Sequence, residues 1–313
     1  MQCIPKNSLL EHRPETFLSI RKEYNLDKPG EMEDAIRILR EWVQKQHHFK
    51  KKDFSDHYLE ATIIACKGSI ERAKTQIDRM CTLRTLLPHF FGTYNVKTDM
   101  GIVFDVMTAV ILPKLTPDLY RVFLVKINKK AYLIKDYLNY FIHNIILAEY
   151  IKTHDYCLGF HIILDLTEMN IMDFLPNLNP VQIRQAMTIM IEGYGMRIKG
   201  MHIFSPSKLI DSFVMILKQV TSPKIASRIH SYTTLEPLSN IVPFEVLPSD
   251  YGGQERPLKA IFEEWKDLLS SKEHLEHLES MNEAGTDESC RQTDKFNEQY
   301  AGMPGTFRLL TVD

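Results

Sequence analysis

The feature that most constrains the fold of this chain is the alternation of short apolar segments with amphipathic segments between residues 121 and 220. Residues 121–127 (RVFLVKI) and 159–165 (GFHIILD) are rich in β-branched and aromatic residues, as strands are. Residues 133–152 and 180–194 instead carry apolar side chains at helical spacing. Strands that alternate with helices predict an α/β domain with a mixed or parallel sheet, and the unbroken apolar run GFHIILD predicts a strand buried on both faces.

The next stretch, residues 197–217, reads RIKGMHIFSPSKLIDSFVMIL: a strand, a Ser/Pro break and a very apolar helix. Such a helix could be packed in the hydrophobic core, contact a membrane or form the wall of a binding cavity. Arg197 and Lys199 are two residues apart, so a strand points both to one face. Lys224 and Arg228 are four apart, on one helix face. One such pair is typical of solvated surface, but two pairs flanking an apolar helix favour anionic head groups.

The regions on either side have a different character. The first 95 residues read as a small helical bundle, with an apolar stripe in EDAIRILREWVQKQ and a serine cap at Ser69. The turn at residues 250–253 (DYGG) closes the α/β region, and one helix over 258–278 and a polar tail follow. We therefore expect a helical domain over 1–95, an α/β domain over 96–253, and a C-terminal helix with an extended tail over 254–313.

Charge and composition limit the classes of function. A net charge of -2 argues against generic nucleic-acid binding. Five cysteines without a CxxC fit a reducing compartment. The N-terminal residues hold proline and charges where a signal peptide needs its apolar segment, and no window approaches 18 uninterrupted apolar residues. We expect a cytoplasmic protein without a transmembrane segment.

Catalytic motifs are scarce. The chain has no GxSxG, HExxH, Walker or GxGxxG motif, so we expect no catalytic residue, no metal site and no cofactor. His274 and His277 have a metal-like spacing, but KEHLEHLES offers no other ligands, which favours a solvated helix face. Asp165, after the buried strand, suits either a base or, more commonly, a turn residue.

The apolar helix faces are more informative. The segments 133–152, 181–194 and 207–219 carry wide stripes of Phe, Tyr, Met and Ile. Any one stripe is best explained as core. Together they exceed what one sheet face readily covers, which predicts a cavity that they jointly line, and methionines suit flexible ligands. Four residues are candidate polar anchors in it: Tyr137, Tyr140, Asn144 and Tyr194.

Several of these motifs carry a family resemblance. RIKGMHIFSPSKLIDSFVMILKQVTSPKIASRIHSY, followed by LPSDYGG (247–253), resembles the CRAL-TRIO (Sec14-like) lipid-binding proteins, in particular the branch of α-tocopherol transfer protein and cellular retinaldehyde-binding protein. CKGSIERAKTQIDRMCTLRTLLP (66–88) is similar to the helical N-terminal domain of insect members, and GTFRLLTVD (305–313) to their C-termini. Three positions depart from the family pattern. Gly195 replaces a proline, Glu168 a glycine and Ile64 an arginine.

The resemblance implies an α/β fold in which a helical N-terminal domain precedes a CRAL-TRIO domain whose mixed sheet floors a lipid pocket. It implies a mobile gate helix over about 207–220. A phosphoinositide-binding basic patch falls on Arg197, Lys199, Lys224 and Arg228. The lipid-binding residues implied are Leu138, Phe141, Ile142, Ile145, Leu164, Ile189, Met190, Tyr194, Ile198, Met201, Ile210, Phe213 and Ile216.

The function expected from these features is non-enzymatic. The protein would bind a small hydrophobic lipid, tocopherol-like, retinoid-like or another isoprenoid, and transfer it between membranes, docking reversibly on phosphoinositide-containing surfaces. Two alternatives stay open. One is an enzyme that uses Asp165 with His161 or His202 on the captured lipid. The other is a scaffolding module without a lipid.

Overall fold

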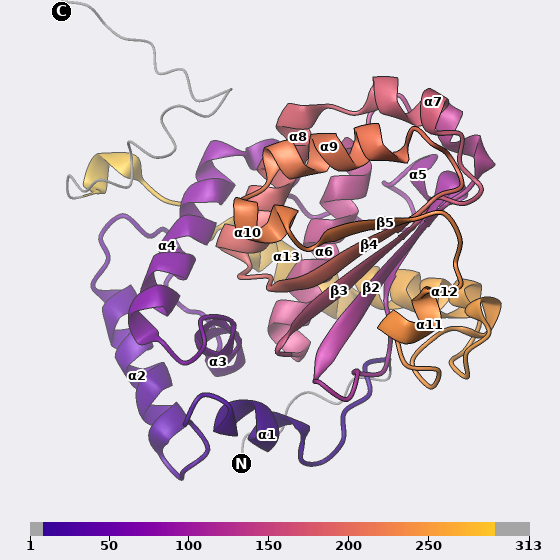
Figure 1. Cartoon of the computed structure of the whole chain (residues 1–313). Helices are drawn as coiled ribbons and strands as arrows, with labels where there is room; N and C mark the ends of the chain where they lie inside the picture. Colours follow the sequence, from indigo (N-terminus) through magenta and orange to yellow (C-terminus); the bar gives the residue numbers. More distant parts are fainter. Residues whose placement is uncertain (1–8, 292–313) are drawn as a thin grey trace, which may run out of the picture.

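A five-stranded mixed sheet forms the centre of the fold (Figure 1). The computed structural model describes residues 9–291. The strands follow one another across the sheet in chain order, with β1 antiparallel to β2 and the other neighbouring pairs parallel. Their bounds are β1 Met107–Ile111, β2 Tyr120–Ile127, β3 Gly159–Asp165, β4 Ile198–Phe204 and β5 Ile229–Tyr232. The α/β fold with a mixed sheet predicted from the sequence is confirmed, although β1 and β5 were not anticipated.

A helical region precedes the sheet, as expected. It contains α1 Thr16–Lys22, α2 Glu31–Gln44, α3 Asp56–Ala65 and α4 Ile70–Leu86. The side chains of Ser55 and Ser69 cap α3 and α4 by accepting hydrogen bonds from backbone N–H groups in the first turn. The short helix η1 Pro88–Phe90 follows α4, where proline cannot continue the helix.

The remaining helices connect and cover the strands. They are α5 Val103–Val106, η2 Lys129–Leu133, α6 Leu138–His154, α7 Ile171–Phe174, η3 Leu175–Asn177, α8 Pro180–Thr188, the π-helical turn η4 Ile189–Gly193, α9 Ile210–Val220, α10 Pro223–Ala226, α11 Leu238–Ile241, η5 Ser249–Tyr251, α12 Leu258–Leu269, α13 Lys272–Asn282 and η6 Glu288–Cys290. In Figure 1, α8 and α9 lie over the sheet, and α3 and α4 stand to one side of it.

Three predicted helices differ from the observed ones for local reasons. The helix predicted from residue 133 begins at Leu138, where Asp136 Oδ1 accepts the Leu138 N–H. The gate helix predicted from residue 207 begins at Ile210, after a turn in which Ser207 Oγ accepts the Leu209 N–H. The single helix predicted over 258–278 is two, because Ser271 caps a new helix by accepting the His274 N–H. The C-terminal segment GTFRLLTVD and the polar tail expected before it lie outside the described residues, apart from the tail's first positions.

Buried polar contacts join the helical region to the α/β region. Gln76 Nε2 on α4 donates to Gly193 O at 3.0 Å. Gly195 has a φ of +72°, which proline cannot adopt, and a Cβ on it would lie 2.6 Å from Gln76 Oε1. The glycine at the family's proline position therefore lets the two regions approach closely.

Candidate ligand-binding site

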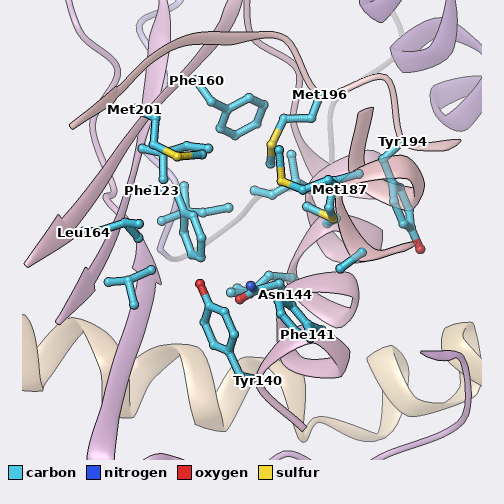
Figure 2. Close-up of a pocket in the computed structure, with 18 of the residues that line it drawn as sticks. Phe123, Tyr140, Phe141, Asn144, Phe160, Leu164, Met187, Tyr194, Met196 and Met201 are labelled. Carbon is cyan, nitrogen blue, oxygen red and sulfur yellow. The ribbon is translucent and has the colours of Figure 1, made fainter. Parts of the chain in front are cut away.

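An apolar cavity of about 200 Å³ lies between the sheet and the helices that cover it (Figure 2). One water molecule needs roughly 10–15 Å³ of such space, so the cavity is large enough for an organic ligand. Side chains from all three layers line it: the helical region, the sheet, and the helices α6 to α9.

The sheet supplies the floor of this cavity. Phe123, Val125 and Ile127 of β2 line it, and so do Phe160, Ile162 and Leu164 of β3. Each set has the two-residue period of a strand, so one face of the sheet is turned to the cavity. Figure 2 shows the labelled members of this floor, with Met201 of β4 beside them.

Helix α6 forms the longest wall. Its cavity-lining residues recur every three or four positions, which places them on one helix face. They are Tyr140, Phe141, Asn144, Leu147, Ala148, Ile151 and Lys152, with Tyr137 just before the helix and Asp155 just after it. This stripe is mostly apolar but carries an amide and an amine, so the wall offers polar groups to a ligand.

The other walls come from three further segments. Met187 of α8, Met190 of η4 and Met196 line the cavity, and Figure 2 shows Met187 and Met196. Phe213 and Leu217 of α9, one turn apart, also line the cavity. Helix α3 closes the site with Ala61, Ile64 and Ala65. Ile64, where the family has an arginine, makes this wall apolar.

Six of the thirteen predicted lipid-binding residues line the cavity: Phe141, Leu164, Met190, Tyr194, Met201 and Phe213. The structure places the other seven outside the lining, where they pack in the apolar core: Leu138, Ile142, Ile145, Ile189, Ile198, Ile210 and Ile216. On α6 and β4 the reason is geometric. Ile142 and Ile145 lie on the α6 face that packs on neighbouring helices, and Ile198 has the opposite parity to Met201 on its strand.

The candidate polar anchors fall into two groups. The hydroxyl of Tyr137 and Asn144 Oδ1 are buried without a hydrogen-bond partner within residues 9–291, and Tyr140 also lines the cavity. Tyr194 differs, because its hydroxyl donates to Glu149 Oε2 at 2.7 Å and accepts from Arg84. Figure 2 shows that hydroxyl directed away from the cavity. Only the first group is available to a ligand.

The four residues of the basic patch have unequal freedom. Arg197 donates to the hydroxyl of Tyr24 and to Cys157 O, and Arg228 donates to Ile198 O. Both guanidinium groups are therefore engaged in hydrogen bonds within the protein. Lys199 lies over the ring of Tyr120, 4.6 Å from its centroid, and Lys224 is exposed on α10. The prediction that Lys224 and Arg228 share one helix face is wrong, because α10 ends at Ala226 and Arg228 lies just before β5. Arg197 also lines the cavity, so the patch adjoins it.

The residues of the enzyme alternative lie on the other face of the sheet. Asp165 and His161 alternate with Ile162 and Leu164 along β3, and His202 follows Met201 on β4, so the strand period turns them away from the cavity. Asp165 accepts hydrogen bonds from the hydroxyls of Tyr251 and Thr167, the contacts of a structural residue. No cluster of His, Cys, Asp or Glu within residues 9–291 could hold a metal ion.

Several lining residues were not singled out from the sequence. Phe123, Phe160 and Met187 belong to segments that were predicted as strand or helix. Alternation of side chains along β2 would have identified Phe123 as a cavity residue. Lys152 was not anticipated either, because the helix pattern was assigned from its most apolar stripe.

Two segments of the chain match models of known protein families. Residues 111–253 match the family model described as CRAL/TRIO domain. This part of the chain is therefore similar to a CRAL/TRIO domain. Residues 28–100 match the model described as Pinta-like, UBA domain. The solved structures include a match titled "Crystal structure of Sfh5", which is 8% identical, covers 81% of this chain and 93% of that chain, and has a TM-score of 0.48.

The cavity spans both matched regions. Ile64 belongs to the Pinta-like segment, and Phe141 and Phe213 belong to the CRAL/TRIO segment. The match over residues 111–253 supports the resemblance to CRAL-TRIO proteins inferred from the sequence. The tocopherol and retinaldehyde branch and the similarity to insect members stay predictions. Across residues 9–291 the structure has no helix that is both long and apolar enough to span a bilayer.

Proposed function

We propose that this protein binds one small hydrophobic lipid in the cavity and transfers it between membranes in the cytoplasm. The observation that carries the proposal is the apolar cavity, which is lined mostly by the segment that matches the CRAL/TRIO model. Burying a lipid chain contributes roughly 0.8 kcal/mol per methylene, but the chain is equally buried in a bilayer. The free energy of the lipid in the cavity therefore needs only to match that in the bilayer. The protein must lower the kinetic barrier to the exit of the lipid from the membrane.

Helix α9 is suited to act as the gate in this proposal. Its inner side chains Phe213 and Leu217 line the cavity, while Met215 is 56% exposed on its outer side. Leu209, just before the helix, and Met172 on α7 are also exposed, and Figure 1 shows α7 and α9 along the same side of the molecule. Apolar surface of this kind docks where it buries itself in a membrane interface.

The basic patch would hold the open form at an anionic, phosphoinositide-containing leaflet. Each lysine or arginine near such a surface contributes about 1 kcal/mol, so the binding would be reversible. Lys199 and Lys224 are the members to test, because Arg197 and Arg228 also hydrogen-bond within the protein.

The first experiment is organic extraction of the purified protein followed by mass spectrometry. We expect a stoichiometric, chemically unmodified lipid. Ala148→Phe, which adds volume inside the cavity, should lower the lipid content, and Val181→Phe on the exposed side of α8 is the matched control. An empty cavity in the wild type would favour the scaffolding alternative, and a chemically altered lipid would favour an enzyme.

The second experiment measures lipid transfer between vesicles with and without phosphoinositide. Lys199→Ala/Lys224→Ala should slow transfer on the anionic vesicles and leave the rate on neutral vesicles unchanged. Lys272→Ala, which removes an exposed charge from α13, is the control. An unchanged rate for the double variant on anionic vesicles would reject the role of the basic patch.

A further inference from the structure

Lys152 is a buried amine that has no hydrogen-bond partner among the described residues. The residue is 6% exposed, and its Nζ has no hydrogen-bond partner within residues 9–291. It lies on the same face of α6 as Phe141 and Ala148 and lines the cavity. It lies over the ring of Tyr58, whose centroid is 5.5 Å from Nζ.

The acidic groups that could neutralise Lys152 are already engaged. Glu149, one turn earlier on α6, accepts hydrogen bonds from Arg84, Tyr194 and His277. Asp155, a carboxylate that lines the cavity, is bound by Arg121 and His12.

The remaining titratable neighbours do not supply an anion. The thiol of Cys66 donates to Gln76 Oε1, and burial raises its pKa to about 11. His57, on α3, has a lowered pKa because of burial. Arg197, at the same end of the cavity wall, is itself a cation.

A buried ammonium without a counter-ion is costly, and the cost is recovered only by an anion or by loss of the proton. Burial lowers the pKa of Lys152 to about 8, so most of the amine is still protonated at pH 7. An anionic group entering the cavity would meet this charge in an apolar surrounding, where charge-assisted hydrogen bonds are strong.

We infer that Lys152 receives the head group of the bound lipid, and that this head group is a carboxylate. The inference rests on the proposed lipid-binding function and adds a class of ligand to it: a long-chain carboxylic acid, bound ionised. The step is non-covalent, with the ammonium donating hydrogen bonds to the carboxylate oxygens.

The rest of the cavity sets the direction of the chain. The rings of Tyr137 and Phe213 pack on Phe174 at the other end of the α6 wall. Tyr137, at the N-cap of α6, and Lys152 are 15 positions apart, or roughly 22 Å at 1.5 Å per residue. The acid would therefore lie along α6, with its head at Lys152 and its tail toward α9.

The test compares two ligands that differ only in their head groups. Hexadecanoic acid and 1-hexadecanol are titrated by calorimetry into the delipidated full chain at pH 7. We expect the acid to bind more tightly, and Lys152→Met to weaken the acid by roughly tenfold to a hundredfold, the range for a hydrogen bond to a charged group. The alcohol should be affected by less than about threefold, a loss of under 0.7 kcal/mol. Lys272→Met is the control for loss of a lysine elsewhere.

A second measurement does not depend on the variant. As the pH of the wild type rises from 7 to 10, Lys152 loses its proton, so the affinity for the acid should fall and that for the alcohol should not. Equal binding of the acid by wild type and Lys152→Met would overturn the inference and leave lipid binding intact, whereas binding of neither ligand would reject both. Hexadecanal trapped on Lys152 by borohydride, without a preference for the acid, would also overturn it, since the amine would then act as a carbonyl nucleophile.

Discussion

The guanidinium of Arg84 lies 2.7 Å from the carboxylate of Glu149, and both side chains are at most 5% exposed. Arg84 belongs to α4 and Glu149 to α6, so the pair joins the helical region to the wall of the cavity. The hydroxyl of Tyr194, just after η4, donates to the same carboxylate and accepts a hydrogen bond from Arg84. A buried pair of this kind fixes how the two regions sit together.

Removing one member of the pair should be strongly destabilising. In Arg84→Met the carboxylate stays buried without its counter-ion, and we expect the free energy of unfolding to fall by about 3–5 kcal/mol, measured by urea denaturation. Arg84→Met/Glu149→Met removes both charges and should recover most of the loss. A double variant as unstable as the sum of its single variants would contradict this account.

Acid should destabilise the protein through the same carboxylate. Burial alone would raise the pKa of Glu149, but the charge of Arg84 and the hydrogen bonds from His277 and Tyr194 lower it to about 2. The folded pKa is below the unfolded one, so the stabilisation is present above about pH 4.5 and is lost as the pH falls toward 2. Glu149→Gln should flatten the pH dependence of urea unfolding in this window, and Glu276→Gln, an exposed change, should not.

The fold was largely predictable from the sequence, and the cavity only in part. Periodicity located α6 as a helix, but the expected binding residues followed its most apolar stripe. A packed face must be apolar, as Ile142 and Ile145 are, whereas a cavity face tolerates Asn144 and Lys152, which lie on the lining stripe. In β3 both faces are buried, so GFHIILD gives no alternation from which to choose the cavity face.

Gly195 should resist substitution more than a glycine with similar backbone geometry. Gly195 and Gly252 have φ values of +72° and +80°, but a Cβ at Gly195 meets Gln76 at 2.6 Å while one at Gly252 meets nothing within 4 Å. Gly252→Ala therefore measures backbone strain alone, roughly 1–2 kcal/mol. We expect Gly195→Ala to cost clearly more in thermal or urea unfolding, and equal losses would show that the approach to Gln76 is not tight.

Lys152→Met should stabilise the empty protein. Burial lowers the pKa of Lys152 from 10.5 to about 8, so folding at pH 7 carries a cost of roughly 3 kcal/mol for keeping the charged amine buried. That cost is relieved as the pH rises from 8 to 10.5, because the unfolded chain binds more protons there. The gain from Lys152→Met, measured by urea denaturation without lipid, should thus shrink between pH 8 and 10.5. A loss of stability at pH 7 would mean that the amine is already paired.

Substitutions on the two sides of α9 should have different effects if this helix is the gate. Phe213 lines the cavity and is 5% exposed, whereas Met215 is 56% exposed. Phe213→Ala removes a buried ring, so it should lower stability by about 3–5 kcal/mol and reduce the amount of retained lipid. The Met215 side chain is largely exposed in the closed protein, so Met215→Ser should leave stability and lipid content within error. It should still slow transfer between vesicles, because less apolar surface enters the membrane interface. The readouts are urea unfolding, extracted lipid per protein and the vesicle transfer rate. Transfer by Met215→Ser at the wild-type rate would show that α9 does not dock on the membrane.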